Sequence, residues 1–280
     1  MELKSNKIIV ILVWSLNYET ILIIIGGVML SINIIIFMFG CIIGSFLNVC
    51  IYRIPKEESI AYPPSHCGSC GHNLKVLDLV PIFSWLFLRG KCRYCREKVS
   101  KQYPLIEGAT GLLFVFLYLK FGFTIELLKY MIFTSILIVI GVIDFKTRDV
   151  YDSTIIALGI SGVVFTIIEF FMNKQISFIS IILGIAIPTL IIAIFAWFGA
   201  MGWGDVEIIG VVGLFLGFKL NMLNLFISIV LGGMAAFVLM IWKRRGGKDT
   251  MAFGPYIALS SYITLLVGSE ILQWYLSFIR

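Results

Sequence analysis

The chain has 280 residues, of which 60% are hydrophobic and only 14% are charged, and its net charge is +6. Soluble domains are nearer half apolar and a quarter charged, so this composition excludes both a soluble globular protein and a disordered one. The apolar runs are long and continuous. They indicate membrane-spanning helices and exclude an outer-membrane barrel, whose strands show short alternating segments.

Apolar runs follow one another along most of the chain, and a helix of about 20 residues crosses the hydrocarbon core of a bilayer. The segment 8–15 is too short to cross alone. It could lie on the membrane surface, extend the first span or form a ninth. We therefore predict an all-α polytopic membrane protein with about eight spans: 21–52, 104–122, 126–144, 153–171, 177–200, 206–218, 220–242 and 253–278.

A polar and basic segment, residues 53–103, follows the first span. If the crossings alternate, this segment shares one side of the membrane with the loops 145–152, 201–205 and 243–249, and together they carry 15 of the 22 Lys and Arg residues. Basic loops stay in the cytoplasm. We expect this side to be cytoplasmic, with the bilayer as a partner and no nucleic acid bound.

Four of the six cysteines form two CxxC pairs in this polar segment, separated by 21 residues. Four thiolates at such spacing are typical of a tetrahedral, structural zinc site in a small ribbon-like domain. A reducing cytoplasm disfavours the alternative of two disulfides. His66 and His72 adjoin the first pair, and either could replace a cysteine. The expected ligands are Cys67, Cys70, Cys92 and Cys95.

Asp144 and Asp205 end apolar runs on the predicted cytoplasmic side, with two spans between them. An ionised Asp in mid-span costs about 2.5–3.5 kcal/mol, so such residues are functional candidates. Two carboxylates in a poorly hydrated site hold one proton between them. One can then take a proton from water while the other donates one to a peptide carbonyl. The alternative is that each Asp caps a helix or marks the edge of a loop.

Six short motifs follow one another across residues 29–278. They are Gly44–Pro55, Asp78–Gly90, Tyr103–Glu107, Ile143–Asp152, Gly202–Asp205 and Phe253–Ile257. In this order they resemble the bifunctional type IV prepilin peptidases, also called leader peptidase/N-methyltransferases. One departure is Tyr151, which stands where the family usually has proline.

The resemblance implies an aspartic protease at the cytoplasmic face of a bacterial cell membrane, with Asp144 and Asp205 in the two catalytic positions. Such an enzyme cleaves the basic leader of prepilins or pseudopilins after a glycine. It then methylates the new N-terminal amine with S-adenosylmethionine. The implied division is an N-terminal extension (1–28), a first span with the methyltransferase-associated four-cysteine domain (29–107) and a peptidase domain (108–280).

No residue is assigned to the binding of S-adenosylmethionine, because the sequence has no glycine loop of a familiar cofactor fold. Glu107 could contribute to methylation. We interpret it instead as a buried carboxylate neutralised by a nearby Lys or Arg.

Two other classes of protein stay open at this point. One is a transporter with a zinc-ribbon regulatory domain, because intramembrane carboxylates also build ion paths. The lack of an inverted repeat, which many transporters show, argues against it. The other is a presenilin-like GxGD protease that cuts transmembrane helices. Such a protease has no need of the cysteine segment.

Overall fold

The computed structural model describes residues 18–172, 175–243 and 251–279, and all regular structure in these parts is helical. Segment 8–15 and most of the predicted N-terminal extension lie outside them. Seven of the described helices are long and apolar enough to span a membrane, which confirms the predicted all-α polytopic class. They are α2 (Tyr18–Arg53), α4 (Gln102–Phe121), α5 (Ile125–Thr147), α6 (Asp152–Phe171), α7 (Phe178–Trp197), α8 (Trp203–Lys243) and α9 (Gly254–Ile279).

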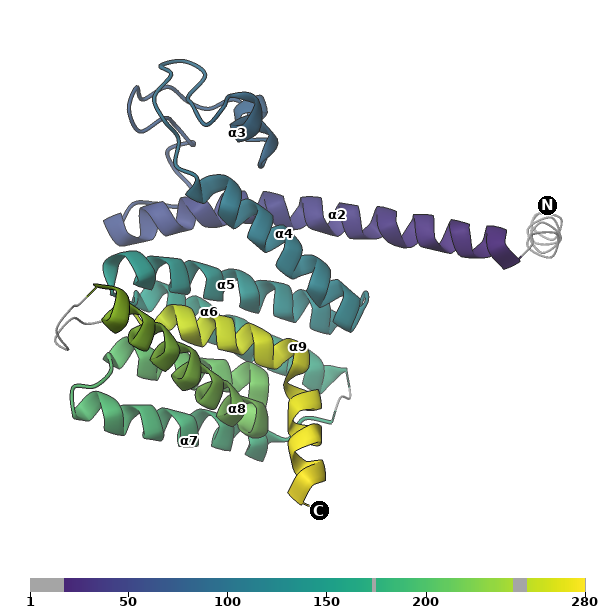
Figure 1. Cartoon of the computed structure of the whole chain (residues 1–280), viewed down its shortest axis with the longest axis vertical. Helices are drawn as coiled ribbons and strands as arrows, with labels where there is room; N and C mark the ends of the chain where they lie inside the picture. The colour runs from purple at the N-terminus through teal and green to yellow at the C-terminus, as the bar shows by residue number, and fades with distance from the viewer. Residues whose placement is uncertain (1–17, 173–174, 244–250, 280) are drawn as a thin grey trace.

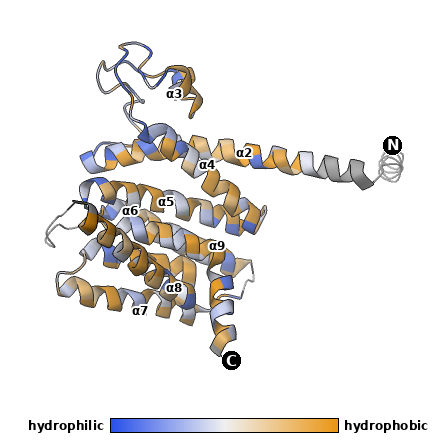
Figure 2. Ribbon diagram, viewed as in Figure 1, coloured by the Kyte–Doolittle hydropathy of each residue, from blue (hydrophilic) through white to orange (hydrophobic). Residues whose placement is uncertain are grey.

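The helices stack in layers, with α2 and α4 crossing at one side of the bundle and α7 and α8 packed at the other (Figure 1). Helices α5, α6 and α9 lie between these pairs. The cysteine segment, which contains the short helices η1 (Ile54–Lys56), η2 (Val76–Asp78) and α3 (Phe83–Phe87), stands outside the bundle beside the junction of α2 and α4. Apolar residues dominate the long helices (Figure 2), as a lipid-facing surface requires.

Close backbone approach between small residues holds α2 against α4. A Cβ atom added at Gly40 would lie 2.7 Å from Cα of Gly111, and one added at Gly44 would lie 2.8 Å from Cα of Glu107. Membrane helices associate through small residues of this kind, because lipid gives apolar side chains no reason to prefer protein. The crossing places Glu107 beside the C-terminal half of α2.

Helix α8 contains two of the predicted spans, 206–218 and 220–242, so seven helices cover all eight predicted spans. The chain is not helical at Gly217, where φ is 66° and ψ is −175°. The side-chain amide of Asn221 donates to the carbonyl of Ile209, 12 positions earlier, at 3.0 Å. In a straight helix these residues would be about 18 Å apart. The chain therefore folds back at Gly217 into two arms.

The fold-back of α8 is built against α7. A Cβ atom added at Gly184 would lie 2.5 Å from the carbonyl carbon of Gly217. The hydroxyl of Ser180 accepts the N–H of Phe218 at 3.1 Å, and the amide of Asn221 donates to the carbonyl of Gly184 at 2.8 Å. Polar groups at the break are thus paired within the protein, as the interior of a bilayer demands.

Buried polar contacts continue from this junction into α9. Asn224 donates to Asn221 at 3.1 Å, and its carbonyl oxygen accepts the hydroxyls of Ser260 and Ser261. All four side chains are fully buried. These contacts align α9 with the second arm of α8 and so fix where α9 begins.

We predict that Gly184→Ala destabilises the protein by about 1–3 kcal/mol, because the added methyl group pushes α7 away from the break in α8. Gly233→Ala is the matched control. Gly233 lies in α8, and a Cβ atom added there meets nothing within 4 Å. Thermal unfolding of the purified variants in one detergent measures the difference. Equal stability of the two variants would contradict this packing.

Candidate active site

Asp144 lies in the last turn of α5 and is 4% exposed. Its Oδ2 atom accepts the backbone N–H of Gly254, the first residue of α9, at 2.7 Å. The first turn of a helix carries unpaired N–H groups and the positive end of the helix dipole, which favour a carboxylate. Asp144 is therefore held by the start of a different helix from its own.

Asp205 lies in the first turn of α8 and is 7% exposed. Its Oδ2 atom accepts the N–H of Gly202, the residue before the helix, at 3.1 Å. A carboxylate at the third helical position commonly reaches back in this way. The helix-capping alternative thus describes part of what Asp205 does, and the same contact fixes where its carboxylate points.

The two aspartates lie close enough for the negative charge of Asp144 to act on Asp205. In each case the hydrogen bond uses Oδ2, and no bond from the described residues to Oδ1 is present. Two buried carboxyl groups with one free oxygen each can bind a water molecule between them and exchange protons with it. This is the arrangement that acid–base hydrolysis of a peptide needs.

Two glycines make room for this arrangement. A Cβ atom added at Gly254 would lie 2.6 Å from Oδ2 of Asp144, and one added at Gly204 would lie 2.6 Å from the side chain of Val150. Sequence reasoning missed the roles of Gly254 and Val150. The Gly-Pro pair that opens the last apolar run was the available signal for Gly254.

Other acidic residues of this membrane face are not part of the pair. Asp149, Asp152 and Glu207 are exposed. They lie around the two buried aspartates without the backbone contacts that fix Asp144 and Asp205.

The four cysteines of the polar segment come together. Their sulfur atoms all lie within 4.8 Å of one another, and those of Cys67 and Cys95 are 3.8 Å apart. Four sulfurs around a metal at about 2.3 Å would lie about 3.8 Å apart in a tetrahedron, so this cluster can hold a metal ion. His66 instead contacts the carbonyl of Pro64, and His72 stacks on Tyr94 with ring centroids 3.6 Å apart.

The two CxxC pairs have the same backbone structure, repeated 25 positions later. The N–H of Cys67 donates to His72 as that of Cys92 donates to Glu97, and each pair is closed by one antiparallel bridge. The residue after each second cysteine, Gly71 and Arg96, has a positive φ. The backbone N–H groups of Cys70 and Ser69 lower the pKa of the Cys67 thiol, which favours the thiolate that metals bind.

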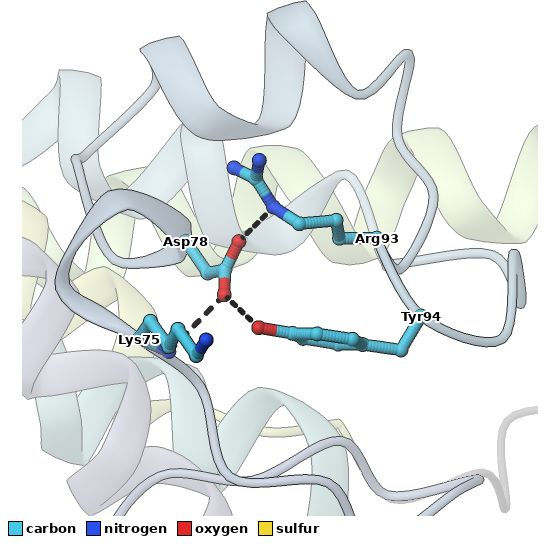
Figure 3. A network of polar contacts seen from close by, with 4 residues as sticks. All are labelled: Lys75, Asp78, Arg93 and Tyr94. Atoms are coloured by element: carbon cyan, nitrogen blue, oxygen red, sulfur yellow. Dashed lines mark hydrogen bonds and ion pairs between the residues drawn. The ribbon is translucent and has the colours of Figure 1, made fainter.

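Asp78 joins the linker between the two pairs to the second pair (Figure 3). Its carboxylate accepts hydrogen bonds from the side chains of Arg93 and Tyr94 and from the backbone N–H of Lys75. Burial opposes its ionisation, but these three donors keep the pKa of Asp78 below its ordinary value. The network therefore orients the loop that carries Cys92 and Cys95.

Glu107 differs from expectation. It is 6% exposed, and its Oε2 atom accepts the backbone N–H of Ile82 at 2.6 Å. The ion pairs among the described residues involve Asp78, Glu169 and Glu270 instead. The expectation of a neutralising Lys or Arg is therefore wrong within the part of the chain that the structure describes.

Comparisons with known proteins agree with this architecture. Residues 38–121 match the family model of the bacterial peptidase A24 N-terminal domain, and residues 131–237 match that of the type IV leader peptidase family. No solved structure matches the chain.

Among curated proteins, the chain is 31% identical over 244 residues to a prepilin leader peptidase/N-methyltransferase of Bacillus subtilis, covering 86% of this chain and 97% of the relative. It is 32% identical over 258 residues to the protein of that name from Pectobacterium carotovorum, covering 82% and 91%. The Aeromonas hydrophila protein of that name is 28% identical over 270 residues, covering 87% and 93%.

Proposed function

Because the chain belongs to the type IV leader peptidase family, we propose that Asp144 and Asp205 are its catalytic pair. The enzyme is a prepilin leader peptidase and N-methyltransferase. One observation carries the assignment: two buried carboxylates interact electrostatically, and each is held through one oxygen by a backbone N–H. Family membership also removes the transporter and the presenilin-like protease as alternatives.

The pair cleaves a peptide bond by moving protons. The ionised carboxylate takes a proton from the bound water, which attacks the carbonyl carbon, and the protonated one donates to the carbonyl oxygen. Gly202 and Gly254 hold the two Oδ2 atoms, so both carboxyl groups are positioned before the substrate binds. No side chain becomes bonded to the substrate.

The cut falls where the substrate leaves the membrane, since the pair sits at helix ends. The loops of this side carry most of the Lys and Arg residues, and we assign it to the cytoplasm. A multi-pass protein of the bacterial cell membrane would then meet the basic leader of a prepilin or pseudopilin on the side where that leader is retained.

A groove between α2, α5 and α6 is suited to this substrate. It has a volume of about 1,080 Å³ and apolar walls formed by residues such as Phe46, Ile132 and Ala157. It reaches Val150, which packs against Gly204 one residue from Asp205. We place the apolar helix of the prepilin in this groove, with the scissile bond at its end beside the pair.

The end of the groove is acidic. Glu57, Glu58 and Asp152 line it, and all three are exposed. A leader that is rich in Lys and Arg complements this charge, and complementary charge speeds encounter and fixes register. Cleavage after a glycine fits the same geometry, because an extended backbone has to pass between the ends of α5 and α8.

Zinc is the metal that we assign to the four cysteines, in a structural role. Bound there, it would crosslink the two CxxC pairs and leave no position open for a substrate. The division of the chain into a four-cysteine domain within 29–107 and a peptidase domain within 108–280 follows this assignment. The first would serve methylation, with S-adenosylmethionine as the methyl donor.

We predict that Asp144→Asn and Asp205→Asn each lower the rate of leader cleavage by about 100-fold or more, because an amide cannot exchange the shared proton. Cleavage of a purified prepilin by equal amounts of inserted enzyme measures this. Glu207→Gln is the matched control, being exposed and in the same turn as Asp205. Substantial cleavage by either Asn variant would remove the assignment.

Charge reversal at the groove tests the substrate's position. The double variant Glu57→Lys, Glu58→Lys should raise KM for a prepilin about tenfold and leave kcat nearly unchanged, because binding rather than the transition state is affected. A prepilin whose leader lysines are replaced by glutamates should bind this variant better, so that its KM returns towards that of the unmodified pair. Glu270→Lys, on α9, is the control. If the leader's charge makes no difference to either enzyme, the acidic end does not bind it.

Purified protein should contain one zinc ion per chain, and Cys70→Ser should lose most of it. Cys41→Ser is the control, since Cys41 is buried in α2 outside the cluster. Because folding of such domains draws on metal binding, the loss should reduce methylation at least as much as cleavage. Metal analysis with mass spectrometry of the processed prepilin measures both. A zinc-free protein with full methylation would overturn this role.

A further inference from the structure

A second cavity lies between the cysteine segment and the bundle, apart from the aspartate pair. Its volume is about 360 Å³, within the range of small-molecule sites. Its walls come from the cytoplasmic half of α2, both CxxC pairs, the linker between them and the first two turns of α4. None of its lining residues belongs to α5, α8 or α9.

Glu107 lines this cavity, and none of the ion pairs among the described residues includes it. Arg53, the basic residue of α2 that lines the cavity, donates to the carbonyls of Ser59 and Pro63 instead. A buried carboxylate without a cation is costly unless something compensates it. Its hydrogen bond from Ile82 is itself held under strain, because Ile82 has a φ of 63°, which a β-branched residue rarely adopts.

Other walls of the cavity suit a ligand with a flat ring and an anionic end. Trp85 is fixed by donating its ring N–H to the carbonyl of Val99 at 3.1 Å, and Tyr103 lies on the α4 side. Lys91 and Lys98 also line the cavity. Aromatic faces bind both flat rings and cations, and ammonium groups bind carboxylates.

We propose that this cavity binds S-adenosylmethionine and that Glu107 balances the positive charge of its sulfonium. The inference rests on the proposed methyltransferase function and names the site for it. The ligand has a flat adenine, a carboxylate and a permanent positive charge on sulfur, which match the aromatic, basic and acidic walls. When bound, it supplies a methyl group on that sulfur.

The same cavity explains how the metal cluster serves methylation. Cys67 and Cys92 line it. A metal that fixes these two residues therefore fixes one wall of the ligand site. Loss of the metal would alter the cavity without touching Asp144 or Asp205.

Equilibrium binding to the zinc-containing full-length enzyme tests the proposal without any prepilin. Two ligands are compared: S-adenosylmethionine and S-adenosylhomocysteine, whose sulfur is neutral. Glu107→Gln keeps the shape and the hydrogen-bonding oxygen but removes the charge. We expect it to weaken binding of S-adenosylmethionine at least tenfold and that of S-adenosylhomocysteine less than threefold. Glu270→Gln, on an exposed part of α9, should change neither.

Unchanged binding by Glu107→Gln, or equal weakening of both ligands, overturns the assignment. Leader cleavage and zinc content should stay at the unmodified level. If the Glu107→Gln variant contains less zinc than the unmodified enzyme, the variant Ser45→Leu is used for the binding test in its place. Ser45 lines the cavity, so the larger side chain should exclude both ligands, and full binding by that variant overturns the site. If the unmodified enzyme binds neither ligand but still cleaves prepilin, the proposed methyltransferase function is wrong and the proposed peptidase function is unaffected.

Discussion

A backbone that breaks inside a bilayer must find its hydrogen-bond partners within the protein, because no water is there to supply them. The break at Gly217 meets this requirement through Ser180, Asn221 and the carbonyls of Gly184 and Ile209. The rest of the peptidase half depends on it. By folding back, α8 returns the chain to the side where it began. The start of α9 can therefore lie beside the end of α5 and donate to Asp144.

The aspartate pair balances two opposed effects. Burial and mutual repulsion disfavour two negative charges, whereas the N-termini of α8 and α9 favour each one. The protein thus needs no cation at the pair, and none of the ion pairs among its described residues involves Asp144 or Asp205. Glu107 lacks such a helix start, and its single backbone donor comes from a strained loop. At the aspartate pair the protein itself compensates the negative charge. At Glu107 a bound ligand would have to supply the compensating positive charge.

Patterns that depend on neighbours in the sequence could be predicted, and those that depend on distant contacts could not. The apolar run 104–122 became α4 (Gln102–Phe121), and the two CxxC spacings brought four sulfurs together. The fold-back of α8 was predicted only as two adjacent spans, 206–218 and 220–242, since the partners that stabilise it lie on α7. The partner of Glu107 is a backbone N–H 25 residues away whose loop geometry no local pattern encodes. The shared backbone structure of the two CxxC pairs could not be predicted from the sequence, because Gly71 and Arg96 are chemically different residues that adopt the same positive φ.

The last turn of α2 has two faces with different surroundings. Arg53 lines the smaller cavity, and Cys50 lines the groove, so a single wall separates them. An amine released at the end of the groove is a tethered reactant as long as its apolar helix stays there. Its effective concentration at the neighbouring cavity is then set by a short tether and lies in the millimolar range, far above that of a free polypeptide. With the substrate helix in the groove and the methyl donor in the cavity, the second reaction would follow the first without a second search.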